Sequence, residues 1–491
     1  MNSHSELHDI AALLRSRIAL IVISSHDEKG VQQLLCDLVR HERRPLFKWS
    51  LTEGLARLDT AMPAQRLHAQ PGDALGHIRA VREPGIYMLA DLHPFLDDPL
   101  HIRLLKDIAL DECHTLVLVS HEVTVPAELE KFSARVQLAL PDAAELEDIV
   151  RQEARLWSRQ SGTPVKTSPQ ALAMLVRNMR GLPRIDVRRL ARNAMADDGA
   201  ITASDLPQVT EAKYRLLGSD AVLQFEYDSV SPAQVAGFSR LKQWLATRRP
   251  FFLGEAGAPG GRRPRGVLLL GVQGCGKSLA ARSVAGSWGV PLLRFDAGAL
   301  YDKYIGESER NLREALVTAE VMAPCVLWID EIEKGLATGE GDQGTSRRIL
   351  GTLLTWMSEQ RGAVFLVATA NDIQVLPPEL VRKGRFDEVF FVDLPGAQAR
   401  AETLRIHLRR HGAEPADFDL DMLVQRSDGF SGAEIEQAVV SAYYAAHAKA
   451  GKLDTQGLLQ ELAETRPLSV LMAEPVAQLR HWAHSRTVPC D

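Results

Sequence analysis

The chain has 491 residues, of which 45% are hydrophobic and 24% are charged. This is the composition of a folded globular protein, and the length suffices for about three folding units. The 57 Lys and Arg residues against 63 Asp and Glu residues give a formal net charge of −6. A broad basic surface for nucleic acid or an anionic membrane is therefore excluded, although a local basic groove is not.

The first residues and the cysteines indicate the cellular compartment of the protein. The amino end has no basic segment followed by an apolar one, so a secretory signal is not expected. No apolar run approaches the length of about 18 residues that spans a membrane. The five cysteines form no CxxC pair and are expected to be ordinary thiols of a reducing compartment. We therefore expect a cytoplasmic protein.

In the first half, short apolar segments come before a helical stretch. Helices are expected at 143–160 and 169–197, after strands at 18–24, 45–50, 85–91, 115–121 and 134–141. Residues 216–235 are expected to link this half to the next. The Pro- and Gly-rich segment 254–266 is expected to be an exposed loop.

The second half shows an α/β pattern more clearly. Helices are expected at 277–289, 307–322 and 346–359, between strands at 266–271, 291–298, 325–331, 364–371 and 387–395. Continuous apolar strands that alternate with helices are typical of a parallel sheet covered on both faces. After Pro395 only helices are expected, which predicts a small helical domain at the end of the α/β one.

One glycine-rich segment carries the strongest chemical signal. Between an expected strand and an expected helix, the GxxxxGK[ST] pattern is matched by Gly271-Val272-Gln273-Gly274-Cys275-Gly276-Lys277-Ser278. The glycines let backbone N–H groups wrap phosphates, and the start of the helix, which continues at Leu279, favours an anion. Lys277 is expected to reach the β- and γ-phosphates, and the Ser278 hydroxyl to bind Mg²⁺. The segment predicts a site for ATP and Mg²⁺.

Two acids follow the third strand of this half. Asp330 and Glu331 end the apolar run Cys325–Ile329, at the sheet edge where ligands of α/β sheets bind. Asp330 is expected to hold the Mg²⁺ shell, and Glu331 to polarise the water that attacks the phosphate.

With these two motifs, residues 225–485 resemble the AAA+ ATPases. By this resemblance Asn371 is the sensor that orients the water, and Arg382 and Arg385 are arginine fingers that act in a neighbouring subunit's site. Tyr304, Ile305 and Gly306 are similar to the family's pore loop, which grips an extended polypeptide. After Asp330 and Glu331 the sequence departs from the family's longer acidic stretch, so no motif defines the second pore loop at about 337–346.

The helical end is similar to the AAA+ lid. By the same resemblance, His407 and the pair Gly432 and Ala433 contact the ribose and adenine, in the manner of the clade that remodels proteins. The P-loop departs from the family, because Val272 and Gln273 stand where two prolines are usual. That change removes no phosphate ligand.

The amino-terminal half lacks these motifs. After its first strand stands Ser25-His26-Asp27-Glu28-Lys29-Gly30, whose acids would repel phosphate, and its strand-end acid Asp91 has no second carboxylate beside it. We expect an AAA-like fold without nucleotide hydrolysis; the alternative is an unrelated α/β partner-binding domain. The whole arrangement resembles the plastid and cyanobacterial (Ycf-type) AAA ATPases.

The expected fold class is an α/β P-loop sheet with a helical lid, preceded by a degenerate AAA-like unit. Five parts are expected: a degenerate α/β domain, a lid-like helical domain, a linker with the start of the AAA module, the AAA+ core, and the lid with a final helix. Their bounds are 1–143, 144–215, 216–265, 266–396 and 397–491.

The expected function is Mg-ATP hydrolysis coupled to remodelling of a protein client by a homo-oligomer, by resemblance a hexamer. One alternative is a nucleotide-gated scaffold that threads nothing, and a second is a nucleic-acid-handling ATPase, which the net charge disfavours. No membrane partner is expected. Neither His41 nor His121 starts a complete HExxH motif, so a zinc protease is not supported, and the scattered histidines are expected to be surface or core residues.

Overall fold

The computed structural model divides the chain into two compact units, Met1–Val209 and Thr210–Asp491. It describes residues 10–25, 27–40, 44–58, 68–121, 123–136, 138–217, 222–226, 232–255, 262–296, 307–336, 343–360, 362–373, 375–382, 384–448 and 451–491. In this part of the chain no helix is long and apolar enough to cross a membrane. All five cysteines are free thiols.

The first unit begins with a six-stranded sheet. Five strands are parallel, β1 (Leu20–Ser24), β2 (Leu46–Ser50), β4 (Ile86–Ala90), β5 (Thr115–Ser120) and β6 (Ser133–Val136), and β3 (Gly54–Arg57) lies antiparallel to β2. The order is β3-β2-β4-β5-β1-β6. The accompanying helices are α2 (Glu28–Val39), α3 (Pro71–Ala80), α4 (Pro99–Leu110) and α5 (Ala127–Glu130). The five expected strands are thus confirmed.

A helical part completes this unit. It contains α6 (Ala143–Ser161), α7 (Pro169–Asn178), α8 (Arg184–Ala196) and the strand pair β7 (Lys166–Thr167) and β8 (Ala200–Ile201), and α9 (Leu206–Leu217) follows. Two ion pairs join α6 to α8: Arg184 with Glu145, at 2.5 Å between Nε and Oε1, and Arg192 with Glu153, at 2.7 Å between Nε and Oε2. The apolar side chains of these helices supply their common packing, as expected for amphipathic helices.

The second unit contains a seven-stranded sheet in the order β15-β14-β10-β13-β12-β11-β9. Its parallel strands are β10 (Gly266–Gly271), β11 (Leu292–Phe295), β12 (Cys325–Ile329), β13 (Val364–Ala370), β14 (Glu388–Val392) and β15 (Val488–Pro489), and β9 (Leu223–Glu226) is antiparallel to β11. Two strands differ from the sequence-based expectation. β9 lies in the expected linker, and β15 returns to the sheet after Pro395, where only helices were expected.

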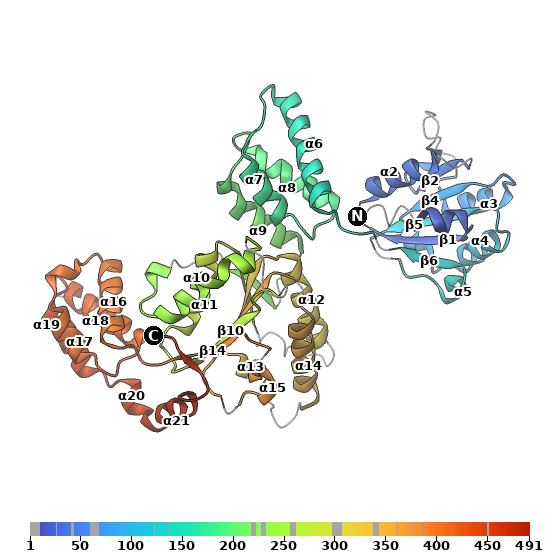
Figure 1. The fold of residues 1–491 in the computed structure, drawn as a ribbon. Helices are drawn as coiled ribbons and strands as arrows, with labels where there is room; N and C mark the ends of the chain where they lie inside the picture. Colours follow the sequence, from blue (N-terminus) through green and yellow to red (C-terminus); the bar gives the residue numbers. More distant parts are fainter. Residues whose placement is uncertain are drawn as a thin grey trace. The chain divides into compact units, whose positions relative to one another are not determined.

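Helices cover both faces of this sheet. Leu268 and Leu270 of β10 pack in one apolar core, and Val267 and Leu269 pack in the other. Figure 1 shows α10 (Ser239–Leu253) and α11 (Lys277–Trp288) on one side, and α12 (Glu307–Val321) and α14 (Gln343–Glu359) on the other. The short helices α13 (Ile332–Leu336) and α15 (Pro378–Val381) complete this part. Burial on both faces explains why the strands are continuously apolar.

The two sheets share one strand order. Numbered in chain order, the first five parallel strands of each unit lie as second, third, fourth, first and fifth: β2-β4-β5-β1-β6 in one and β11-β12-β13-β10-β14 in the other, where β15 is added beside β14. Each sheet also adds an antiparallel strand, β3 or β9, beside its second parallel strand. This agreement supports the AAA-like interpretation of the first unit over an unrelated α/β domain.

The chain after β14 forms a helical subdomain. It consists of α16 (Ala397–Arg410), α17 (Leu420–Arg426), α18 (Gly432–Ala448), α19 (Thr455–Glu464), α20 (Leu468–Leu471) and α21 (Ala473–Ala483). Leu404, Leu408, Ile435, Val439 and Leu458 share its core. Asp419 and Asp454 accept hydrogen bonds from backbone N–H groups at the starts of α17 and α19, as N-cap residues do. The helices expected after Pro395 are confirmed, with β15 as the exception.

Candidate nucleotide-binding site

The P-loop is a tight turn between β10 and α11. Gly274 and Gly276 have φ values of 76° and 85°, in the left-handed region that side chains rarely adopt. At Gly271 a Cβ atom would lie 2.0 Å from the carbonyl oxygen of Val392, so no larger residue fits there. The first N–H groups of α11 have no acceptor within the helix. The turn can therefore present backbone N–H groups to a phosphate.

Lys277 is buried beneath this turn, with 6% of its surface exposed. Its Nζ donates hydrogen bonds to the carbonyl oxygens of Gly271 at 2.9 Å and Val272 at 2.8 Å. Burial lowers the pKa of the Lys277 ammonium to about 8. The side chain is therefore still mainly a cation at neutral pH. The two carbonyl groups hold the Lys277 ammonium next to the phosphate site, and a bound phosphate would replace them as its partner.

Asp330 accepts hydrogen bonds from two hydroxyl groups. Ser278 Oγ lies 3.0 Å and Thr369 Oγ1 lies 2.6 Å from its Oδ1 atom. A hydroxyl and a carboxylate at this spacing are oxygen ligands of the kind that Mg²⁺ prefers, so the residues fit this ion. Thr369 was not among the site residues predicted from the sequence. Its place directly before Ala370 and Asn371, at the carboxyl end of a central strand, is the signal that could have revealed it.

Glu331 lies beside Asp330 with a left-handed backbone, at φ 47°. Asn371 Nδ2 donates to Glu331 Oε1 at 2.9 Å, and Lys334 Nζ forms an ion pair with the other carboxylate oxygen. The Glu331 side chain is 29% exposed, so water can reach it. The structure thus brings together the two residues that were expected to activate and orient water.

Glu333 is a further acid that the sequence-based analysis left without a role. Its Oε1 atom accepts a hydrogen bond from the Asn371 backbone N–H at 2.9 Å, and its Oε2 atom is buried without a hydrogen-bond partner. Burial raises the pKa of the Glu333 carboxyl. Glu333 therefore holds the backbone of Asn371, while the Asn371 side chain is directed to Glu331.

Lys277, Ser278, Asp330, Glu331, Thr369 and Asn371, but not Glu333, line a cavity of about 630 Å³, a volume suited to a nucleotide-sized ligand. Its wall includes the loop and helix residues Gln273–Leu279, the acids Asp330 and Glu331, and Asn371. Gly271 and Val272 lie just outside the lining and contribute the carbonyl groups that hold Lys277. Thus most residues expected from the P-loop and strand-end motifs share one cavity.

The lid supplies another wall. His407, Gly432 and Ala433 all line the cavity, and the Ala433 N–H donates to the Gly274 carbonyl at 3.0 Å. His407 Nδ1 is buried without a hydrogen-bond partner, 3.5 Å from Glu436 Oε1. Burial lowers the pKa of His407, with the Glu436 charge acting in the opposite direction. A neutral imidazole with an unused polar atom can serve a bound ligand.

The end of the described chain also reaches this cavity, which the sequence-based analysis missed. Cys490 and Asp491 line it, together with Phe238. Asp491 Oδ1 accepts hydrogen bonds from the Ser239 N–H at 2.8 Å and the Ser239 hydroxyl at 3.1 Å. The pairing of β15 with β14 brings these residues to the site, and no local sequence motif predicts this pairing.

The arginines lie elsewhere. Neither Arg382 nor Arg385 lines the cavity. Arg382 is exposed, and Arg385 donates hydrogen bonds to the Leu354 carbonyl and the Ser358 hydroxyl of α14. The expected pore-loop residues Tyr304, Ile305 and Gly306 lie outside the described residues, as does 337–342 of the expected second pore loop.

The strand order, the glycine turn, the paired acids and the helical lid together define a P-loop ATPase of the AAA type. The family model "ATPase family associated with various cellular activities (AAA)" matches residues 267–394, and the AAA+ lid domain model matches 417–460. The first unit matches models of SpoVK-like AAA ATPases, the N-terminal domain at 6–138 and the second domain at 144–220.

Relatives of the ycf46 group match almost the whole chain. The AAA domain-containing protein ycf46 of Guillardia theta is 33% identical over 98% of this chain and 95% of its own length. The chain belongs to the AAA ATPase family, in the ycf46 group, and it is an ATPase.

Two other relatives match this chain over only about half of their own length. The ATP-dependent zinc metalloprotease FtsH 3 of Sphaerobacter thermophilus is 34% identical over 50% of this chain and 51% of that protein. The proteasome-activating nucleotidase of Aeropyrum pernix is 37% identical over 39% of this chain and 48% of that protein.

Proposed function

We propose that this ATPase couples Mg-ATP hydrolysis to the remodelling of a protein client, as a ring-shaped homo-oligomer in a reducing compartment such as the cytoplasm. The observation that carries the proposal is the hydrogen bond between Ala433 of the lid and Gly274 of the P-loop. Loss of the γ-phosphate on hydrolysis would move the P-loop, and through this hydrogen bond the movement would reach the lid. Relatives named for ATP-dependent proteolysis and proteasome activation support a protein client.

In the proposed mechanism, the P-loop amides and Lys277 bind the phosphates of ATP. Ser278 and Asp330 would hold Mg²⁺, which neutralises phosphate charge when it is bound. Glu331 accepts a proton from the attacking water, and Asn371 holds the Glu331 carboxylate in position by its 2.9 Å hydrogen bond. His407, Gly432 and Ala433 contact the ribose and adenine.

Arg382 and Arg385 act in the site of a neighbouring subunit. Their place outside their own chain's cavity is what such a role requires. A guanidinium group that stabilises the charge of the transferred phosphoryl group contributes about 10³- to 10⁵-fold in rate. The proposal therefore makes hydrolysis dependent on assembly.

Arg385→Ala is expected to lower the ATPase rate at least about 100-fold while ATP affinity stays within about twofold, because the arginine stabilises the transition state in a neighbour. The measurement is turnover and ATP affinity of the variant alone and mixed with Lys277→Ala. Mixed rings regain activity, since one subunit type has an intact site and the other supplies the arginine. Arg103→Ala, an exposed arginine of the first unit, is the control. Failure of mixing to restore activity contradicts the proposed role in trans.

Tyr304→Ala is expected to abolish unfolding of a protein client while ATP hydrolysis remains, because the pore-loop aromatic grips polypeptide without taking part in chemistry. The measurement is ATP-dependent unfolding of a fluorescent protein that carries an unstructured tail. The matched control is Tyr444→Ala, which removes a lid tyrosine that is 66% exposed. Client unfolding at the wild-type rate in Tyr304→Ala would favour the scaffold, and salt-dependent DNA binding would favour a nucleic-acid role.

A further inference from the structure

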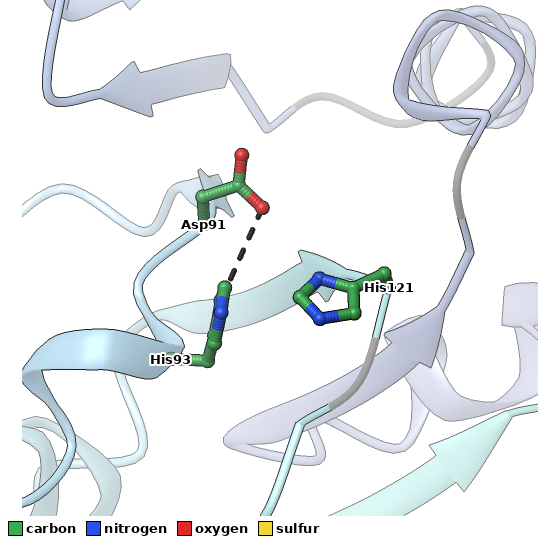
Figure 2. Close-up of side chains that lie close together, drawn as sticks. All are labelled: Asp91, His93 and His121. Carbon is green, nitrogen blue, oxygen red and sulfur yellow. Dashed lines mark ion pairs between the residues drawn. The ribbon is translucent and has the colours of Figure 1, made fainter.

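Two histidines and an aspartate meet at the carboxyl edge of the sheet in the first unit. Asp91 directly follows β4, His121 directly follows β5, and His93 opens a short 3₁₀ turn, His93–Phe95. One possible ligand atom from each lies within 4.8 Å of the others. Figure 2 shows the three side chains around a common space. Within the described residues, no other group of three such side chains is this close.

A buried hydroxyl holds the three side chains together. Ser120, the last residue of β5, is 3% exposed. Its Oγ atom donates to Asp91 Oδ1 at 2.8 Å and lies 2.9 Å from His93 Nδ1 and 3.3 Å from His121 Nδ1. A hydroxyl that donates its one hydrogen to a carboxylate can only accept from the imidazoles. The hydroxyl therefore positions all three groups, which lowers the entropy cost of binding a ligand between them.

The corresponding edge of the second sheet is the nucleotide site. There Asp330 and Glu331 follow the third parallel strand and Asn371 follows the fourth, as Asp91 and His121 do here. Asp91 and Glu331 also share a left-handed backbone, with φ values of 51° and 47°. Both units thus direct polar side chains into the space beyond the same two strands, with imidazoles replacing the amide in the first unit.

The start of α2 disfavours phosphate at this first edge. The carboxylate of Asp27 accepts a hydrogen bond from the Gly30 N–H at 2.9 Å and so caps the start of α2. In the second unit the start of the corresponding helix, α11, follows the glycine turn and carries Lys277. An anion at the first edge would meet the Asp27 carboxylate instead of free N–H groups, so the two sheet edges have different ligand chemistry.

We propose that Asp91, His93 and His121 form a binding site for a divalent transition metal ion, with Zn²⁺ as the best fit. Two imidazoles and one carboxylate suit Zn²⁺, whereas Mg²⁺ and Ca²⁺ prefer oxygen ligands alone. Water can complete the coordination, because 67% of the Asp91 side chain and 28% of the His93 side chain are exposed. The histidines that were expected to be ordinary surface or core residues thus acquire a ligand role.

Only small side-chain movements are needed. Ligand atoms of a tetrahedral zinc ion lie about 3.3 Å apart, as its bond lengths require. The two imidazole rings meet edge to face with centroids 4.9 Å apart, and because Nδ1 of each ring donates to the Ser120 hydroxyl, Nε2 is the atom that each ring offers to the metal. The exposed Asp91 carboxylate can turn toward them without disturbing the buried strands.

The test is a titration of the full-length, untagged, nucleotide-free protein with Zn²⁺ and with Co²⁺. The wild type is expected to bind one equivalent that His121→Gln and Asp91→Asn both lose. Ser120→Ala is expected to bind about 10- to 100-fold more weakly, since it loses the group that orients the ligands. Bound Co²⁺ is expected to give a visible spectrum without thiolate charge transfer, which excludes the cysteines.

The control is the double variant His68→Gln and His77→Gln, a stacked pair with ring centroids 4.4 Å apart that belongs to no cluster of three metal-ligating side chains within the described residues. It is expected to bind Zn²⁺ as the wild type does. Circular dichroism checks that each variant is folded, and Zn²⁺ is expected to raise the melting temperature of the wild type but not of His121→Gln. Zinc binding that persists undiminished in folded His121→Gln and Asp91→Asn overturns the proposal. Lys277→Ala is expected to keep the metal, so the result is independent of the nucleotide site.

Discussion

Lys277→Ala is expected to lower ATP affinity by at least about 100-fold, since hydrogen bonds to charged groups contribute about 1.5–3 kcal/mol each and a tenfold change corresponds to about 1.4 kcal/mol. Lys277 is the cation of the P-loop, and its Nζ atom now lies on the carbonyl groups of Gly271 and Val272. Phosphate oxygens are stronger partners for an ammonium than these neutral carbonyl groups. The measurement is calorimetric titration of the purified protein with a non-hydrolysable ATP analogue in the presence of Mg²⁺.

The stability of the nucleotide-free protein is expected to change little in this variant. Burial disfavours the Lys277 charge, as its lowered pKa of about 8 indicates, so removing the ammonium also removes a desolvation cost. The matched control is Lys213→Met. Lys213 is also buried with a pKa lowered to about 8, but it donates to the Val321 carbonyl at 2.5 Å and does not line the cavity. Wild-type ATP affinity in Lys277→Ala would refute the assignment of the phosphate site.

Glu331→Gln is expected to bind ATP normally and to hydrolyse it about 10²- to 10⁴-fold more slowly, the range that a general base contributes. Glutamine keeps the size of the side chain and can still accept the hydrogen bond from Asn371 Nδ2. Its amide cannot take a proton from water. The measurement is the single-turnover rate of ATP hydrolysis beside the affinity for ATP.

Glu333→Gln is the comparison that separates the base from its support. Glu333 contacts the Asn371 backbone, is largely buried and has a raised pKa, so its loss is expected to reduce turnover less than the loss of Glu331 does. A larger loss in Glu333→Gln than in Glu331→Gln would move the catalytic base to Glu333. Normal turnover in Glu331→Gln would remove Glu331 from the mechanism.

The slow, ATP-bound state of Glu331→Gln also gives access to the client. An ATPase that releases its partner on hydrolysis retains it when hydrolysis is blocked. The separate Arg385→Ala variant is also expected to stall with ATP bound, because the arginine is missing from the neighbouring subunit's site. Agreement between the partners captured by these two variants would connect the captured protein to the ATP cycle rather than to one altered surface.

The sequence by itself determined the phosphate site and the layered fold. Gly274 and Gly276 must adopt left-handed backbone, and Lys277 and Ser278 follow them directly, so the whole requirement of the P-loop is local and visible in neighbouring letters. The parallel strands were equally visible, because strands buried on both faces are continuously apolar. The acids Asp330 and Glu331 follow such a strand and needed no further information.

Only the tertiary structure decided which distant residues meet. Thr369 joins Asp330, and Ala433 joins Gly274, through contacts between segments far apart in the chain. The same holds for Asp91 and His121, which the parallel sheet brings together because the carboxyl ends of neighbouring strands lie at one edge. β15 was invisible for a related reason, since a two-residue strand is defined by its partner β14 and has no periodicity of its own. Local backbone requirements can be predicted from residue types in order, whereas pairings across the fold depend on the packing of all the elements between them.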